Sequence, residues 1–215
     1  MERISTRPEE PVLLTWPLNS QNASLFLREF SKIINSEWDF SQVNEKILEK
    51  RLESGELLLG TFYKGKPAGI LETISFDLPE EINAGTRKER AAYICRQIKP
   101  YLELTNNGLW RIKPNNPNVT VLVDVTAGIQ YRGKIPVARD LVQNAQRLLT
   151  TDYIVTFTPD IENLKKWHIG LGAFDTEVVL RNARLNYKQL NVNFMCYKAP
   201  EYGRHLESGE IRKAA

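Results

Sequence analysis

The stretch from residue 119 to residue 150 constrains the fold more than any other part of the sequence. It begins with valines that alternate with other residues, which is the period of a half-buried strand: Val119, Val121, Val123 and Val125. It ends with apolar residues at three- and four-residue spacing, which gives a helix one apolar face: Val137, Ala138, Leu141, Val142, Ala145, Leu148 and Leu149. The stretch therefore predicts a strand, a tight turn and an amphipathic helix, in that order.

The turn, residues 130–136, has the properties of an anion-binding site. Gly133 allows the backbone to approach a ligand closely, and Pro136 fits the first helical turn, where its missing N–H costs little. A turn that opens a helix presents unpaired N–H groups and the positive end of the helix dipole, which suits a phosphate. Arg132 and Lys134 add positive charge at the same place.

This turn resembles the acyl-CoA pyrophosphate loop of the GNAT superfamily of N-acetyltransferases, whose pattern is Gln/Arg-x-x-Gly-x-Gly/Ala. Gln130, Arg132 and Gly133 match the pattern, whereas Ile135 stands where the pattern has Gly or Ala. The resemblance implies acetyl-CoA or another acyl-CoA as co-substrate. Its pyrophosphate would bind Arg132, Gly133, Lys134, Ile135 and Val137, and its pantetheine arm would pair with the central strand near Val125 and Thr126.

The order of the elements before the turn agrees with the resemblance. We expect a strand at 11–16, a helix at 22–34, a second helix capped by Ser41, and strands at 56–63 and 67–75 joined by a turn at residues 64–66. The implied fold is α/β (α+β), with a mixed, mostly antiparallel sheet that is flanked by helices and splayed near the central strand. One domain would span residues 1–198, followed by a polar tail at 199–215.

Residues 77–118 form the least regular part of the sequence, a variable excursion with a helix expected at 87–98. Such a long connection is either a surface excursion or a lid or acceptor wall, for which Tyr93, Tyr101 and Trp110 offer aromatic surface. The sequence does not decide between these alternatives.

Beyond the central helix we expect a strand at 152–157 and a helix that begins at Thr158-Pro159-Asp160. The buried side of this helix is predicted from its apolar spacing: Ile161, Leu164, Trp167, His168 and Leu171. Two further strands follow, at 174–180 and 192–198.

A second motif lies on this helix. Asn163 matches the Asn of the other CoA-side motif of the superfamily, and His168 stands where that motif has a Tyr that protonates the departing thiolate. Imidazole is a stronger acid than phenol by about three to four pKa units, and it can also donate a hydrogen bond to a carbonyl or enolate oxygen. The alternative is a histidine that simply packs beside Trp167.

The presence of a histidine at position 168 is a second resemblance, to the GNAT-like loading domains of some polyketide synthases. These domains decarboxylate malonyl-CoA and pass the acetyl group to a carrier protein. In that branch a Thr and an Arg complete the site, and Thr156 and Arg184 are the candidates. Thr156 and His168 would hold the thioester oxygen, and Arg184 a carboxylate or carrier phosphate.

The composition of the chain argues against several other classes of protein, namely nucleic-acid-binding, membrane-spanning, secreted and metal-binding proteins. With 29 basic and 26 acidic residues the net charge is only +3, so we expect no nucleic-acid partner, and no apolar run is long enough to cross a membrane. The start of the chain does not read as a signal peptide, which favours a cytoplasmic location. His168 and His205 have no metal-ligand spacing with Cys95 or Cys196, so no metal is expected.

The sequence thus predicts an acyltransferase, most simply an N-acetyltransferase, that moves an acyl group from CoA to an amine of a small molecule or a peptide. The alternatives are the decarboxylative loader with an acyl carrier protein as partner, and a non-enzymatic acyl-CoA-binding domain. Asp124, expected on one face with Leu122 and Thr126, is either a base for the acceptor or an acid without a role.

Overall fold

The computed structural model describes residues 11–37, 43–53, 57–78, 85–104, 118–185 and 188–197, of which 101–104, 182–185 and 188–190 are described by their backbone. A seven-stranded sheet in the order β1-β2-β3-β4-β5-β7-β6 organises them. The strands are β1 (Leu13–Pro17), β2 (Leu58–Tyr63), β3 (Lys66–Phe76), β4 (Val119–Ala127), β5 (Tyr153–Pro159), β6 (Ala173–Leu185) and β7 (Lys188–Tyr197). Neighbouring strands are antiparallel except β4 and β5, which are parallel. The expected mixed, mostly antiparallel sheet is confirmed.

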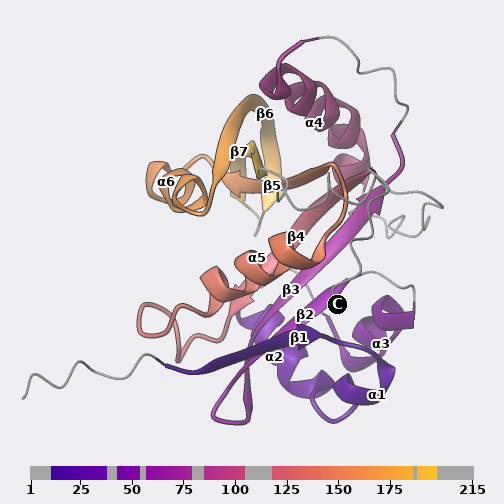
Figure 1. The fold of residues 1–215 in the computed structure, drawn as a ribbon, viewed down its shortest axis with the longest axis vertical. Helices are drawn as coiled ribbons and strands as arrows, with labels where there is room; N and C mark the ends of the chain where they lie inside the picture. The colour runs from indigo at the N-terminus through magenta and orange to yellow at the C-terminus, as the bar shows by residue number, and fades with distance from the viewer. Residues whose placement is uncertain are drawn as a thin grey trace, which may run out of the picture.

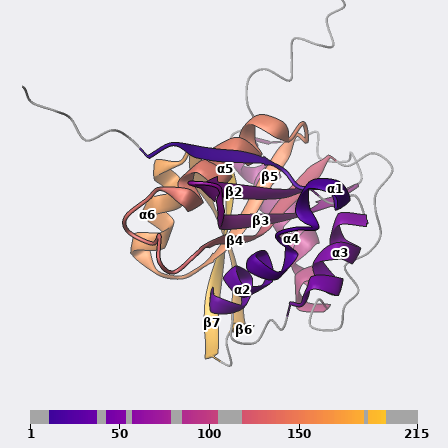
Figure 2. The same cartoon turned by 90° about the horizontal axis from the view of Figure 1, so that it is seen from below.

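Helices cover both faces of this sheet (Figure 1): α1 (Ser20–Ala23), α2 (Leu27–Glu37), α3 (Glu45–Glu53), α4 (Arg87–Leu104), α5 (Val137–Leu148) and α6 (Glu162–Gly170). Alternation along β3 shows which helices share a face. Ile70 packs in the α1–α3 cluster and Phe76 in the α4 cluster, whereas Leu71 packs in the α5 cluster. Figure 2 shows α5 and α1–α3 on opposite sides of β2–β4.

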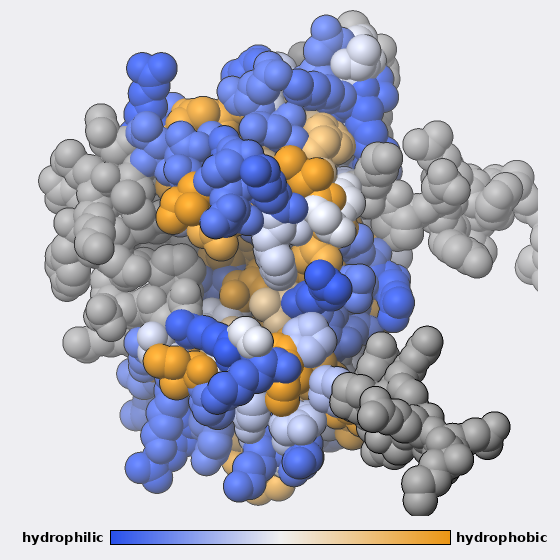
Figure 3. Space-filling view, turned by 90° about the vertical axis from the view of Figure 1, so that its left-hand side faces the viewer, coloured by the Kyte–Doolittle hydropathy of each residue, from blue (hydrophilic) through white to orange (hydrophobic). Residues whose placement is uncertain are grey.

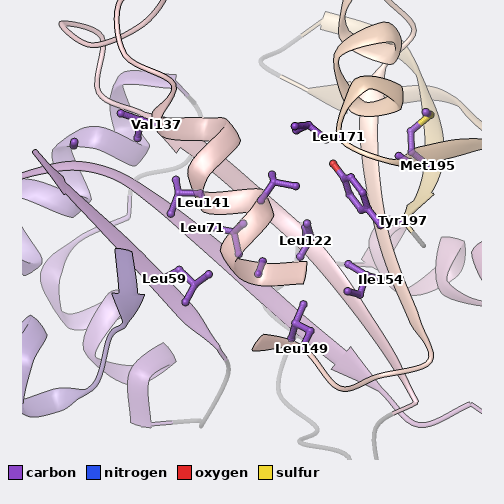
Figure 4. Close-up of a cluster of buried hydrophobic side chains, with 14 residues drawn as sticks. Leu59, Leu71, Leu122, Val137, Leu141, Leu149, Ile154, Leu171, Met195 and Tyr197 are labelled. Carbon is purple, nitrogen blue, oxygen red and sulfur yellow. The ribbon is translucent and has the colours of Figure 1, made fainter. Parts of the chain in front are cut away.

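The α5 helix forms as the sequence predicts because its apolar face meets the sheet. Val137, Leu141, Val142 and Ala145 are fully buried, and Figure 4 shows Leu141 next to Leu71 of β3. Burying a Val or Leu side chain stabilises the fold by about 2 kcal/mol each. Close packing depends on Gly69 of β3, where a Cβ would lie 2.4 Å from Val137 Cγ1 and 2.8 Å from the Thr126 carbonyl oxygen.

The sheet splays between its two central strands. β4 and β5 pair only from Val119↔Tyr153 to Leu122↔Thr156. Beyond Leu122, β4 continues to Ala127 without pairing with β5. The predicted splay is therefore present, and its vertex lies at Leu122 and Thr156.

The strict alternation predicted for β4 is interrupted by a β-bulge at Val123. Asp124 lies opposite Glu72, but the next pair is Leu122 with Thr73, so Val123 is an extra residue. An extra residue reverses the faces of the residues that follow it. Val119 and Val121 therefore pack with α4, and Val125 packs on the α5 side. Asp124 was predicted to share a face with both Leu122 and Thr126. It shares a face with Thr126 only, so the prediction is wrong for Leu122.

The helix expected at 22–34 is in fact two helices. Asn19 caps α1 by accepting hydrogen bonds from the N–H groups of Gln21 and Asn22 at 3.0 and 2.9 Å, and the Asn22 side chain completes the capping box. The chain then turns at residues 24–26 before α2 begins. The Ser41 cap lies outside the described residues, and α3 begins later, with Asn44 Oδ1 accepting from Ile47 N at 3.0 Å.

The helix start predicted at Thr158-Pro159-Asp160 is wrong. Thr158 and Pro159 are the last residues of β5, and α6 begins at Glu162. Proline is tolerated here because β5 beyond Thr156 is paired on one side only. The predicted buried side is also too wide: Ile161 and Leu164 are 50% and 39% exposed, and within α6 only His168 is buried.

The excursion at 77–118 contributes to the core. The predicted helix is present as α4, and Ala91, Ile94, Cys95 and Ile98 are buried against β4, β5 and β7. Cys95 and Cys196 are both buried free thiols in this cluster. Tyr93 is partly exposed, whereas the side chain of Tyr101 and all of Trp110 lie outside the description, as does the tail at 199–215.

Candidate functional site

The loop between β4 and α5 is closed by short backbone hydrogen bonds. Tyr131 N donates to Gly128 O at 2.8 Å, and Lys134 N and Ile135 N both donate to Tyr131 O, at 3.1 and 3.0 Å. Gly133 has φ +70°, a conformation that L side chains rarely adopt, and a Cβ there would meet no atom within 4 Å. The exposed loop thus leaves open space beside its glycine.

The start of α5 supplies hydrogen-bond donors for an anion. No side chain caps the helix, and the N–H groups of Gly133, Ala138 and Arg139 have no partner among the described residues. Together with the positive end of the helix dipole, these amides favour a phosphate. The amide of Val137, predicted as a ligand contact, donates to Ile135 O at 2.9 Å, so its neighbours are the better candidates.

The charged residues of the loop are exposed. The Arg132 Nε donates to Ala127 O at 2.9 Å, which holds its guanidinium near the end of β4. Lys134 is exposed, and Ile135 packs against the α5 cluster. The carboxylate of Asp140, in the first turn of α5, accepts a hydrogen bond from the Thr15 hydroxyl of β1. The side chains thus add positive charge beside the unpaired amides.

The part of β4 that does not pair with β5 leads from this loop to the vertex of the splay. Val125 is half-buried on the α5 side, and Thr126 is buried on the other, with a hydroxyl that has no partner among the described residues. Figure 3 shows the face that carries α6 and the loop: it is hollowed near its middle, and hydrophobic side chains lie inside the hollow. An extended ligand could therefore run along β4 with its anionic end on the loop.

Across the splay, His168 is held by a residue that the sequence did not single out. Its Nδ1 lies 2.6 Å from the hydroxyl of Tyr197, and the Trp167 ring meets the imidazole edge to face. Burial lowers the pKa of His168 from 6.5 to about 4 and raises the pKa of Tyr197. The imidazole is therefore neutral near pH 7, so it is not the imidazolium acid that a comparison with phenol suggests.

The other predicted catalytic residues are only partly brought together. Thr156 is buried at the vertex, and its hydroxyl donates to Leu122 O at 3.3 Å. It lies opposite Met195, on the sheet face that carries Tyr197. Arg184 pairs with Gln189, eight residues before Tyr197 on β7, which is roughly 26 Å of extended strand. The structure thus does not place Arg184 near His168.

Asn163, the remaining predicted residue, lies exposed on the first turn of α6. Its predicted contact with CoA stays a prediction. Leu164 follows it and is also partly exposed.

On the opposite sheet face, two carboxylates lie side by side. Glu72 of β3 and Asp124 of β4 are direct neighbours across the strands, and Arg51 of α3 forms an ion pair with Glu72. Glu72 is buried and Asp124 half-buried. They lie between the α1–α3 cluster and the α4 cluster, so α4 belongs to the same side of the sheet as these acids.

Two further observations concern the described residues alone. No group of three or more His, Cys, Asp or Glu side chains among them could hold a metal ion. None of their helices is long and apolar enough to cross a membrane.

The fold resembles that of solved GNAT acetyltransferases. The protein yncA from Salmonella typhimurium, solved with acetyl-CoA, is 12% identical, with 88% of this chain and 95% of that chain covered and a TM-score of 0.58. A GNAT-family acetyltransferase from Bacillus cereus is 11% identical, with coverage of 88% and 99% and a TM-score of 0.56. A ribosomal-protein-alanine N-acetyltransferase from Brucella melitensis is 13% identical, with coverage of 86% and 99% and a TM-score of 0.54.

No protein-family model and no curated protein matches the sequence. The likeness therefore concerns the fold, and the chain has the GNAT acetyltransferase fold that its sequence predicted.

Proposed function

We propose that the protein is an acyl-CoA-dependent acyltransferase, most simply an N-acetyltransferase. The observation that carries the proposal is the set of amides at the start of α5 that have no partner among the described residues, directly beyond the part of β4 that does not pair with β5. A CoA thioester needs both features, because its pyrophosphate is anionic and its pantetheine arm carries amides that can pair with a strand edge. The presence of acetyl-CoA in the Salmonella typhimurium structure supports this co-substrate.

In the proposed arrangement the pyrophosphate binds the amides of Gly133, Ala138 and Arg139, with Arg132 and Lys134 adding charge. The pantetheine arm runs along residues 123–127 of β4. The thioester then reaches the vertex at Thr156 and lies near His168, whose neutral ring donates a hydrogen bond to the thioester oxygen or to the departing sulfur.

The acceptor amine would approach from the sheet face that carries α1–α4. Its nitrogen attacks the thioester carbonyl carbon, the C–N bond forms, and the C–S bond breaks with the electron pair going to sulfur. Asp124, beside Glu72 on this face, is the candidate to take the proton that the amine loses.

Two acceptor classes remain proposals: an amine of a peptide and an amine of a small molecule. The Brucella melitensis neighbour is a ribosomal-protein-alanine N-acetyltransferase, which supports a peptide amine. The carrier-protein alternative is less well supported, because the backbone position of Arg184 is far from His168. A cytoplasmic location stays a prediction from the sequence.

The test is calorimetry with acetyl-CoA, followed by mass spectrometry of the full chain incubated with acetyl-CoA and a panel of amines. We expect binding and a product heavier by one acetyl group, both lost in Gly133→Glu. Binding without any acetylated product would favour the non-enzymatic acyl-CoA-binding domain, and absence of binding would contradict the proposal. A parallel incubation with malonyl-CoA, in which acetyl-CoA and carbon dioxide appear, would instead establish the decarboxylative reaction.

A further inference from the structure

The contact between His168 and Tyr197 joins two residues that are 29 positions apart in the sequence. His168 lies on α6 and is 7% exposed, and Tyr197 is the last residue of β7 and is fully buried. Figure 4 shows the Tyr197 hydroxyl pointing toward the end of α6, near Leu171. Neither side chain has another hydrogen-bond partner among the described residues.

This isolation determines which atom donates. A buried hydroxyl hydrogen without an acceptor is unfavourable, because it has lost its hydrogen bond to water and gained none in the protein. If His168 Nδ1 donated to Tyr197, the phenolic hydrogen would be left without an acceptor among the described residues. If Tyr197 donates to Nδ1, its only hydrogen is satisfied, and the ring proton must then reside on Nε2, because the imidazole is neutral.

The second ring nitrogen of His168, Nε2, is in a different environment from Nδ1. His168 Nε2 has no partner among the described residues, yet it is not among the fully enclosed side-chain atoms that lack one. It therefore keeps some contact with solvent.

We infer that Tyr197 is a positioning residue: its buried hydroxyl donates to His168 Nδ1 and thereby holds the ring in the tautomer that carries its proton on Nε2, the nitrogen that keeps contact with solvent. The consequence for catalysis rests on the proposed function. A neutral Nε2–H donates a hydrogen bond to the charge that develops on the thioester oxygen or on sulfur, without giving up its proton. Complete transfer is disfavoured, since it would leave either an imidazolate or a buried Tyr197 phenolate, and burial raises the pKa of that phenol.

The experiment is nitrogen-15 NMR of the full-length protein with labelled histidine. The chain has two histidines, so His205→Gln leaves the signals of His168 alone. We expect a protonated Nε2 and an unprotonated Nδ1 that accepts a hydrogen bond. In Tyr197→Phe, the Nδ1 signal should move to that of a nitrogen without a hydrogen bond. A protonated Nδ1 in the parent protein, or an unchanged Nδ1 signal in Tyr197→Phe, would overturn the inference, and the parent measurement decides even if the variant fails to fold.

Kinetics supply the second readout. Tyr197→Phe should lower kcat about tenfold, the effect of one lost hydrogen bond, with less than a twofold change in the Kd for CoA. A kcat equal to that of the parent protein, or a loss of CoA affinity that matches the loss of kcat, would contradict the positioning role. Absence of turnover in the parent protein contradicts the proposed function instead, and the NMR measurement still decides the contact.

Discussion

The two sides of the splay differ in exposure, in charge and in the contacts that fix their geometry. The loop from Gly128 to Pro136 exposes most of its residues, carries positive charge, and takes its geometry from hydrogen bonds between residues close in sequence. The pair of His168 and Tyr197 is buried and neutral, and its geometry depends on α6 packing against β7. A site for binding can therefore be local and solvated, whereas the proposed site for chemistry requires the assembled core.

The largest expected effect comes from Gly133→Glu, which attacks the loop alone. A carboxylate in the open space beside the unpaired amides should weaken CoA binding by at least about 100-fold through charge repulsion and lost backbone access. Calorimetry measures it, with Gly133→Ala as the matched control, for which we expect a stability loss of about 1 kcal/mol from the φ of +70° and weaker effects on binding. Unchanged CoA affinity in Gly133→Glu would show that the phosphates bind elsewhere.

A pH titration of stability probes the buried pair alone. Burial lowers the pKa of His168 to about 4 from its ordinary 6.5, so the unfolded chain binds more protons between these values. The contribution of His168 to the free energy of unfolding is fully present above pH 6.5. It should fall by about 3 kcal/mol as the pH decreases from 6.5 to 4. Chemical denaturation of the protein and of His168→Phe across this range isolates the effect; parallel curves would contradict it.

His168→Phe should separate chemistry from binding. We expect kcat to fall about 100-fold, because the hydrogen-bond donor to the developing charge is lost, while the Kd for CoA changes little. Steady-state kinetics and calorimetry on the same preparation give both values. Equal losses in kcat and in affinity would place His168 in binding and remove the contrast between the two sides.

The smallest effect is expected for Lys134→Ala. The Lys134 side chain is exposed, so its charge is screened, and CoA affinity should fall by only about two- to threefold at low salt and less at high salt. Calorimetry at two salt concentrations measures it. A loss that rivals that of Gly133→Glu would mean that side-chain charge, rather than the backbone amides, holds the phosphates.

The same contrast explains what the sequence could predict. The strand, loop and helix from Val119 to Leu148 follow local rules of periodicity and turn chemistry, and they appear almost as predicted. The splay could be predicted because the resemblance implied it. Tyr197 could not, since its partner is distant in sequence and nothing near the end of β7 marks it. Glu72 and Arg51 were missed for the same reason: their ion pair joins α3 to β3.

The errors also have physical causes. Thr158-Pro159-Asp160 carries strong helix-start chemistry, but pairing of β5 with β7 prevailed through Pro159. Ile161 and Leu164 have the spacing of a buried helix face, yet they lie at the end of α6 that extends beyond the core. Local preference fails where strand pairing, or the position of a helix end relative to the core, decides the outcome.

The bulge at Val123 changes which face of the sheet the odd-numbered residues of β4 occupy. Before it, odd-numbered residues belong to the α4 side, and after it they belong to the α5 side, so a single row of valines fills two separate cores. Deleting Val123 would make the alternation regular and leave the residues before and after it on their present faces, with Asp124 still opposite Glu72. Deleting a residue after the bulge, by contrast, would exchange the faces of the residues that follow it, although the composition of the strand would hardly change.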